Sequence, residues 1–311
     1  MNTKTQELTY GAMIVAIFGV LLLINRQTGG FFEGIFMFIF PIPMVAFSAK
    51  YGFKDSLAVF VCTVLIAFLF GTFTAIFYAV SESFIGMVYG SCIYAKKDMN
   101  RTLVLVIVLS AAAELLATVA LASVSGIDLN ADIMAMQESM NSVFEQAGMT
   151  NVTEMLSYDY LRRMYIISTG FLGAMQGIIV YYLSLQILRK LRYPIQKPMP
   201  LSKYYPSKIS GFIAFALVFV YIYTMAKPFS NELAQNILQS AGMCGVIYLI
   251  FFGYIALLLV CRVYFRLPKF LGMLLSVFLC FAISYIPIIF GFAYISGGLH
   301  EAIDARLTGA R

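Results

Sequence analysis

Two carboxylates and an amide lie inside stretches of sequence that are otherwise apolar. Glu82 and Glu114 each fall in a run long enough to cross a membrane, and Gln176 falls in another. A charged side chain in hydrocarbon costs about 2.5 to 3.5 kcal/mol on insertion scales, so these residues are the first candidates for a functional site. Glu33, near the outer end of a further run, is a fourth candidate. Paired carboxylates suit a cationic or multiply hydroxylated ligand better than an anion.

Helix geometry predicts that three of these side chains share one depth. The runs carrying Glu82 and Glu114 form an antiparallel hairpin that closes around Asp98. Glu82, Glu114 and Gln176 each lie twelve or thirteen residues from the same end of their runs, or about 18 to 20 Å at 1.5 Å per residue. We therefore predict a ligand-binding chamber that opens outward, with Glu33 above it. The structural alternative is that each carboxyl hydrogen-bonds a neighbouring helix and only holds the bundle together.

The sequence lacks the residue patterns that mark several classes of enzyme. No nucleotide-binding G-x-x-x-x-G-K-[ST] loop, G-x-S-x-G or H-E-x-x-H occurs, and His300 is the single histidine. The five cysteines lie in apolar runs without CxxC spacing, which is typical of packing residues. We expect no enzyme activity, no catalytic residues, no metal and no cofactor.

Composition places the chain among polytopic membrane proteins. Of its 311 residues, 61% are hydrophobic and 12% are charged, and the mean hydropathy is +0.87. This excludes a soluble fold. We predict an all-α transmembrane bundle of about nine passes (8 to 10). The expected passes are 8–24, 31–49, 56–70, 76–95, 102–124, 164–188, 209–226, 237–261 and 270–295.

The basic residues indicate topology rather than nucleic-acid binding. With the N-terminus in the cytoplasm, 15 Lys and Arg residues fall on the inner side and 6 on the outer side, as the positive-inside rule requires. We therefore expect a bacterial inner-membrane protein whose first partner is the lipid bilayer, with no nucleic acid bound.

Two polar stretches divide the passes into domains. Residues 125–163 form an acidic external segment in which Ile133, Met136 and Met140 repeat at helical spacing, so we predict an amphipathic helix. Residues 193–208 are basic and proline-rich, which predicts a cytoplasmic joint. We thus expect a six-helix membrane domain over 1–192, the joint over 193–208 and a three-helix sub-bundle over 209–311.

Small residues recur four apart in three of the passes. The pairs are Ala12 with Ala16, Gly86 with Gly90, and Gly173 with Gly177. This spacing lets a neighbouring backbone approach closely, and packing within the chain is its ordinary meaning. Pro41, Pro43 and Pro287 interrupt their passes, which indicates kinks or cavities.

Several strings resemble a known family. The N-terminal LTYGAMIVAI over 8–17, followed by Pro41-Ile42-Pro43 and Lys50-Tyr51-Gly52, resembles the YybS-like family of uncharacterised bacterial membrane proteins. So does FRLPKFLG over 265–272, with Gly298-Leu299 and Asp304-Ala305-Arg306 near the end. That family looks distantly similar to the S components of energy-coupling factor transporters, which implies a six-helix substrate-binding core. The resemblance also implies that Ala12 and Ala16 contact a membrane coupling subunit, although the three C-terminal passes and the acidic outer segment depart from an S component.

Three functions remain open at this point. The first is a transporter-like subunit that binds a small molecule from outside, with Glu82, Glu114, Gln176 and Glu33 as its site. The second is a non-transporting envelope scaffold that recruits partners through its C-terminal sub-bundle and joint. The third is a proton-coupled secondary carrier that uses the two glutamates of the hairpin.

Overall fold

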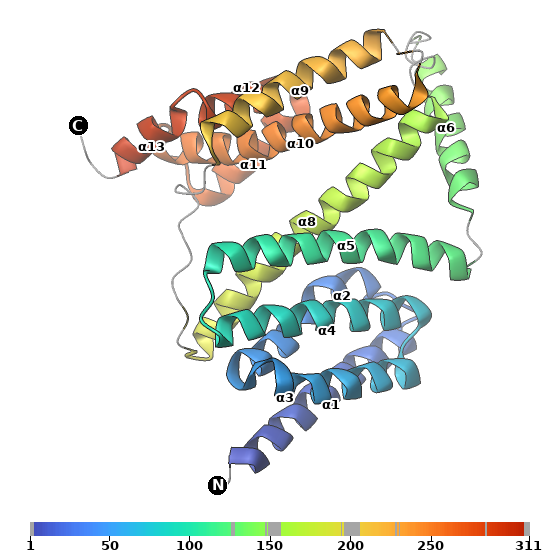
Figure 1. The fold of residues 1–311 in the computed structure, drawn as a ribbon, viewed down its shortest axis with the longest axis vertical. Coiled ribbons are helices and arrows are strands. Elements are labelled where there is room, and N and C mark those ends of the chain that lie inside the picture. The colour runs from blue at the N-terminus through green and yellow to red at the C-terminus, as the bar shows by residue number, and fades with distance from the viewer. Residues whose placement is uncertain are drawn as a thin grey trace. The chain divides into compact units, whose positions relative to one another are not determined.

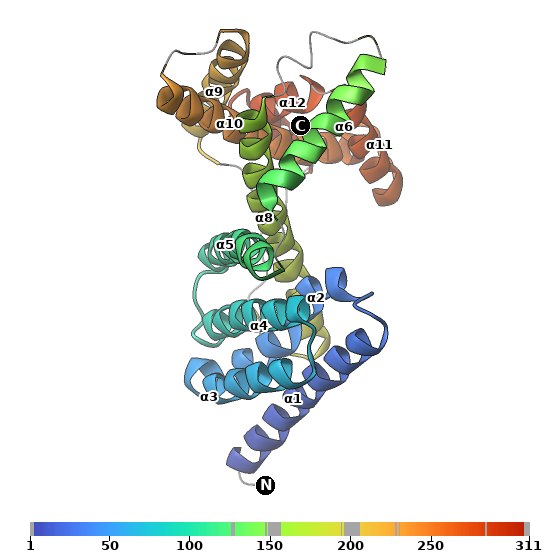
Figure 2. The ribbon, with the colours of Figure 1, turned by 90° about the vertical axis from the view of Figure 1, so that its right-hand side faces the viewer.

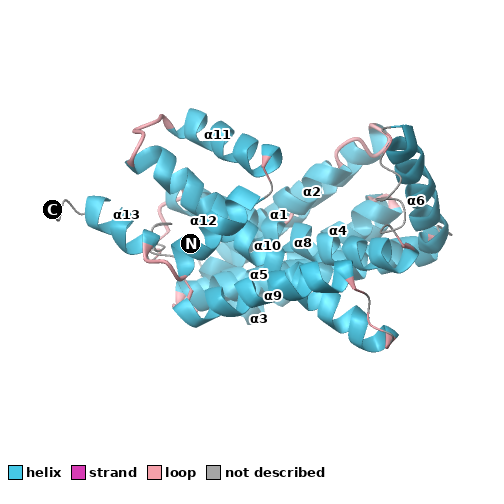
Figure 3. Ribbon diagram, turned by 90° about the horizontal axis from the view of Figure 1, so that it is seen from above, coloured by secondary structure: helices cyan, strands magenta, loops and turns pink. Residues whose placement is uncertain are grey.

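The structure is a computed structural model that describes residues 3–125, 128–146, 148, 157–193, 195, 206–227, 229, 231–283 and 285–307. These residues form helices and loops and contain no strand (Figure 3). Most of the predicted joint at 193–208 lies outside the described residues, as do parts of the external segment, at 126–127, 147 and 149–156. The predicted all-α polytopic fold is confirmed.

Seven helical segments of the described chain are long and apolar enough to cross a membrane, with α2 and α3 counted together, or eight if one bent pair is also counted as a span. The candidates are α1 (Thr3–Gln27), α2 with α3 (Glu33–Ile39 and Pro41–Phe70), α4 (Phe73–Tyr94), α5 (Met99–Ser125), α8 (Tyr158–Lys190), α9 (Lys208–Ala226) and α10 (Glu232–Val263). The predicted external amphipathic helix is α6 (Leu129–Gln146). Because no soluble core could absorb these apolar surfaces, the chain is a multi-pass membrane protein.

The second and third predicted passes meet inside α3. The helix is interrupted at Gly52, whose φ of +83° lies in the left-handed region where glycine alone is unstrained. The ring of Tyr94 lies 3.0 Å from the position a Cβ would take there. The break therefore falls between Ala49 and Ser56, where the sequence predicts it.

The predicted ninth pass, 270–295, differs from the structure. It forms two helices, α11 (Lys269–Ala282) and α12 (Tyr285–Ile295), bent by 114° relative to each other. Pro287 explains the break because it has no N–H to bond the carbonyl of Ile283, and its ring would clash with that carbonyl in a continuous helix. The chain is extended at Ile283, so the break falls about one turn before the proline rather than at it.

The described helices cluster into two compact units. The N-terminal unit comprises Met1–Gly148 and Ser168–Pro198, and the C-terminal unit comprises Met149–Ile167 and Met199–Arg311. Helix α8 contributes residues to both units.

In the N-terminal unit, α4 lies between α3 and α5 (Figures 1 and 2). Gly86 and Gly90 allow this on the α3 side, since a Cβ at Gly86 would stand 2.4 Å from the Pro41 carbonyl oxygen and one at Gly90 would stand 2.5 Å from that of Val45. On the other side, the stacked rings of Tyr89 and Tyr181 join α4 to α8, and the Tyr89 hydroxyl donates to the Tyr181 carbonyl at 3.1 Å. Small-residue packing therefore sets the position of α4.

The C-terminal unit packs α9, α10 and α12 around a core of its own. Here too glycine permits contact, because Gly253 of α10 meets the Pro287 carbonyl and Gly291 of α12 meets the Leu249 carbonyl. An exposed ion pair of 3.0 Å joins Lys208 to Glu301 in α13 (Leu299–Leu307), and it holds the pKa of the Glu301 carboxyl below its usual value.

The close contact at Gly86 predicts that substitution by alanine changes the stability differently at Gly86 and at Gly34. Gly86→Ala should destabilise the protein by about 1 to 3 kcal/mol, because the new methyl group meets backbone atoms that cannot rotate away. Gly34→Ala in α2 is the matched control, since nothing lies within 4 Å of its Cβ position. It should be neutral or stabilising by about 0.4 to 1 kcal/mol. Thermal unfolding in detergent would measure both, and equal midpoints would contradict the close approach.

Candidate functional site

Glu82 is the most deeply buried carboxyl of the described chain. It lies on α4 one turn before Gly86, and its side chain is 1% exposed. A side-chain hydrogen bond joins it to Gln176 of α8, which is 3% exposed. Within the part of the chain that the structure describes, the Oε2 atom of Glu82 has no hydrogen-bond partner. A buried polar atom left in this way is an available acceptor for a ligand.

Gln176 is positioned by the backbone contact between α8 and α5. Its neighbours along the helix, Gly173 and Gly177, take the positions where α8 approaches Ser110, and Cβ atoms there would stand 2.8 Å from the Ser110 carbonyl and 3.0 Å from its hydroxyl. The amide nitrogen of Gln176 donates to the Met37 carbonyl of α2 at 3.2 Å. One side chain therefore links α8 to both α2 and α4.

Glu114 approaches the same region from α5. Its Cβ atom lies 2.8 Å from the Cβ position of Gly173, and its side chain is half-buried. Its carboxyl lies near enough to that of Glu82 for the two to repel each other when both are ionised. Ser110, one turn earlier on α5, has a buried hydroxyl without a hydrogen-bond partner among the described residues. The structure thus brings Glu82, Glu114 and Gln176 together, as the depth counting predicts.

Glu33 lies nearer the end of the helices. Its Oε1 atom accepts a 2.5 Å hydrogen bond from the hydroxyl of Thr72, the N-cap of α4, and a 3.5 Å bond from the amide of Asn25 in α1. Thr72 precedes Glu82 by ten residues, or about 15 Å of helix. Glu33 therefore lies beside the N-terminal end of α4, at a distance from Glu82. Its hydrogen bonds also join the ends of α1, α2 and α4.

Tyr78 belongs to this site although the sequence reasoning did not select it. Its hydroxyl lies close enough to the carboxyl groups of Glu33, Glu82 and Glu114 for the charge of each to act on it. It precedes Glu82 by four residues, so the two side chains share one face of α4. This four-residue spacing is the sequence feature from which Tyr78 could have been identified. The acidic cluster is hereafter Glu82, Glu114, Gln176 and Tyr78.

The cluster gathers hydrogen-bond acceptors, and none of its four members is Lys, Arg or His. A carboxylate oxygen without a partner, a second carboxylate, an amide and a phenol can together hold an ammonium group or several hydroxyls. In the described ranges no three His, Cys, Asp or Glu side chains gather where they could hold a metal ion. The arrangement therefore places several hydrogen-bond acceptors together inside the N-terminal unit.

Removing the Gln176 amide should destabilise the fold. Gln176→Leu leaves both Glu82 and the Met37 carbonyl without their donor, at a cost of about 1 to 3 kcal/mol. Gln186→Leu is the matched control, because Gln186 lies on the same helix with an exposed side chain. Thermal unfolding of both variants in detergent tests this, and a Gln176→Leu midpoint equal to that of Gln186→Leu would contradict the buried hydrogen bonds.

Comparison with known proteins places the chain in a family. No match was found among curated proteins or among solved structures. The family described as predicted membrane protein (DUF2232) matches residues 16–293, which include every member of the acidic cluster. Seven apolar helices and this match agree, and the chain belongs to the DUF2232 family of predicted membrane proteins.

Proposed function

We propose that this membrane protein is a transporter-like subunit that binds a small cationic or multiply hydroxylated molecule at the acidic cluster. The observation that carries the proposal is Glu82, which is 1% exposed and keeps one carboxylate oxygen without a partner among the described residues. A carboxylate in an apolar bundle is costly unless something compensates it, and a bound ammonium or hydroxyl group would do so. The role is binding and delivery rather than catalysis.

The positive-inside count supports an inner-membrane location with a cytoplasmic N-terminus. In this orientation Glu33 and Thr72 lie on the outer side of the cluster. A ligand from outside would pass Glu33 before it reaches Glu82. The proposal therefore gives Glu33 a role at the entrance to the site.

Ligand binding predicts a stabilisation that depends on Glu82. A panel of soluble amines and polyols is screened for thermal stabilisation of the purified protein, where saturation at 100 times Kd contributes about 2.7 kcal/mol. Glu82→Gln and Glu114→Gln should lose this stabilisation, because the neutral amide no longer attracts a cation. Glu138→Gln removes a carboxylate from the exposed face of α6 and should keep it.

The outcomes separate ligand binding from a purely structural role and from a proton-coupled carrier. If no compound distinguishes wild-type protein from Glu82→Gln, the binding proposal fails and the glutamates only join helices. If a pH gradient alone drives solute uptake into liposomes, and Glu82→Gln abolishes it, the protein is a proton-coupled carrier instead.

We further propose that α1 docks a membrane coupling subunit, as the resemblance to S components implies. Ala12 and Ala16 are exposed and line a groove of about 650 Å³ between α1 and α3. Gly11, Gly19 and Ala58 line the same groove beside larger apolar residues such as Val15 and Val20, so a docking helix would meet a largely apolar surface. The described residues leave both alanines uncovered, unlike the Gly86 and Gly90 pair.

Photocrosslinking in cells tests this docking. A photoreactive residue at Ala12 or Ala16 should capture a second membrane protein, whereas one at Val108, exposed on α5, should not. Capture of an energy-coupling transmembrane subunit would make this chain a transporter component. Crosslinks only within the chain would reduce the groove to packing, and crosslinks to envelope-assembly proteins would favour the scaffold function.

A further inference from the structure

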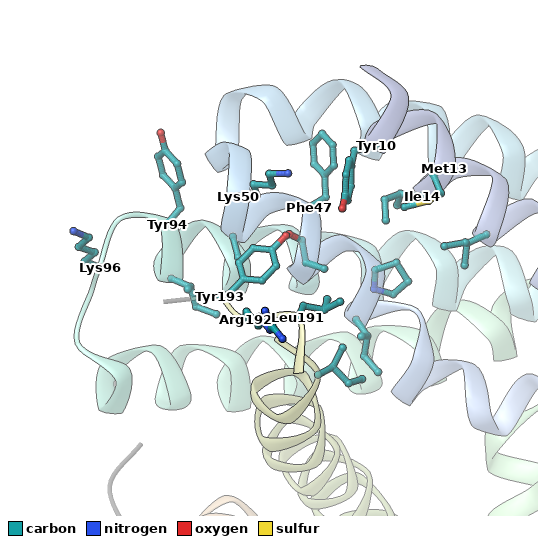
Figure 4. A pocket seen from close by; sticks show the side chains of 17 residues that line it. Tyr10, Met13, Ile14, Phe47, Lys50, Tyr94, Lys96, Leu191, Arg192 and Tyr193 are labelled. Atoms are coloured by element: carbon teal, nitrogen blue, oxygen red, sulfur yellow. The ribbon is translucent and has the colours of Figure 1, made fainter. Parts of the chain in front are cut away.

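A second pocket lies at the opposite end of the N-terminal unit from Glu33, where α4 and α8 finish. Its volume is about 750 Å³, within the range of ligand sites. Every charged residue that lines it in the described chain is basic, namely Lys50, Lys96 and Arg192 (Figure 4). The rest of its lining is aromatic and aliphatic, with Ile14 and Ile17 of α1 among the apolar residues.

Aromatic rings hold Lys50 in place. Its Nζ atom lies 4.3 Å from the centroid of the Tyr10 ring and 5.2 Å from that of Tyr51. In Figure 4 the Lys50 side chain extends toward the side of the pocket that carries Tyr10. No ion pair joins Lys50, Lys96 or Arg192 to an acidic side chain of the described residues. These positive charges are therefore available to an anion.

The other two bases occupy an unusual backbone position. Lys96 and Arg192 have φ values of 51° and 59°, in the left-handed region that favours glycine. Each follows a helix end at which the next residue closes the turn, since the Lys97 N–H bonds the Cys92 carbonyl and the Tyr193 N–H bonds the Leu188 carbonyl. A basic residue complements the helix dipole at such an end. Here Lys96 and Arg192 also add a second and a third positive charge to the lining of one pocket.

Tyr193 closes the pocket between α8 and α3. Its hydroxyl donates to the Ala46 carbonyl at 3.1 Å, which holds the end of α8 against α3. Tyr193 and Arg192 are adjacent, so this contact also limits where the Arg192 backbone can lie. The pocket is a built feature of the N-terminal unit.

We propose that this pocket binds an anionic phospholipid. The phosphate would be held by Lys50 and Arg192, with Lys96 at the edge of the pocket, because basic pockets between membrane helices bind anionic headgroups. One acyl chain would pack along Ile14 and Ile17 of α1. The Ile17 side chain is 38% exposed, so a lipid chain can reach it. A soluble phosphate would use the same cations but gain nothing from the apolar wall, and for this reason we assign the site to a lipid.

Native mass spectrometry of the purified full chain in a non-ionic detergent tests the assignment. Phosphatidylglycerol is titrated against phosphatidylcholine with the same acyl chains. Wild-type protein should bind phosphatidylglycerol more tightly. Lys50→Gln and Arg192→Gln should each weaken this binding about fivefold, the effect of one charge near a membrane surface. Lys97→Gln is the matched control, because it removes an exposed charge next to Lys96 that does not line the pocket.

Each outcome is decisive. Equal binding of the two lipids, or a loss in Lys97→Gln as large as in Lys50→Gln, would overturn the proposal in favour of diffuse surface charge. Full competition by inorganic phosphate or glycerol phosphate would show a soluble anion as the ligand and overturn the lipid assignment. Unfolding midpoints without lipid show that the variants are folded. Glu82→Gln should leave phosphatidylglycerol binding unchanged, so this test is independent of the proposed function.

Discussion

Close approach of helix backbones at glycine is the constraint on which the N-terminal unit depends. Gly86 and Gly90 bring α3 against α4, while Gly173 and Gly177 bring α8 against α5. Glu82 lies one turn before the first pair, and Gln176 lies inside the second. The glycines therefore fix the separation between the helices that carry the polar side chains. A lipid-exposed bundle has little hydrophobic force to join its helices, so these contacts matter more than they would in water.

The two ends of the N-terminal unit carry opposite chemistry. Glu33, Glu82 and Glu114 lie toward one end, and Lys50, Lys96 and Arg192 lie at the other. Between them the stacked Tyr89 and Tyr181 rings are fully buried, and the Tyr181 hydroxyl donates to the Met99 carbonyl of α5. Aromatic packing thus separates an acceptor-rich cluster from a cation-rich pocket. A cationic ligand and an anionic headgroup could be held by one helical unit without competing for the same side chains.

The features of the fold that depend on distance along the chain could be predicted from the sequence. Counting from the helix ends placed Glu82, Glu114 and Gln176 at one depth, and the structure brings them together. The break near Gly52 was also predictable, since a glycine beside charged residues interrupts an apolar run. What depends on angle around a helix was not predicted, because without coordinates the helical phase is undefined. The difference between the buried glycine pairs and the exposed Ala12 and Ala16 was missed for this reason. Tyr78, by contrast, has a four-residue spacing from Glu82 that can be read from the sequence. At Pro287 the sequence predicted a kink. The helix instead breaks at Ile283, whose carbonyl the proline cannot bond.

The proposed function accounts for the polar atoms near Glu82 that lack a hydrogen-bond partner among the described residues. A side chain that only joins helices gains most when all its polar atoms are bonded, and each buried atom left without a partner costs about 1 to 3 kcal/mol. The amide of Gln176 is divided between Glu82 and the Met37 carbonyl, and among the described residues Oε2 of Glu82 receives nothing. Ser110, also buried and without a partner in the described chain, adds a second unused polar atom at the α5 and α8 contact. Under the proposed function, a bound molecule that donates hydrogen bonds to these atoms would remove much of that cost.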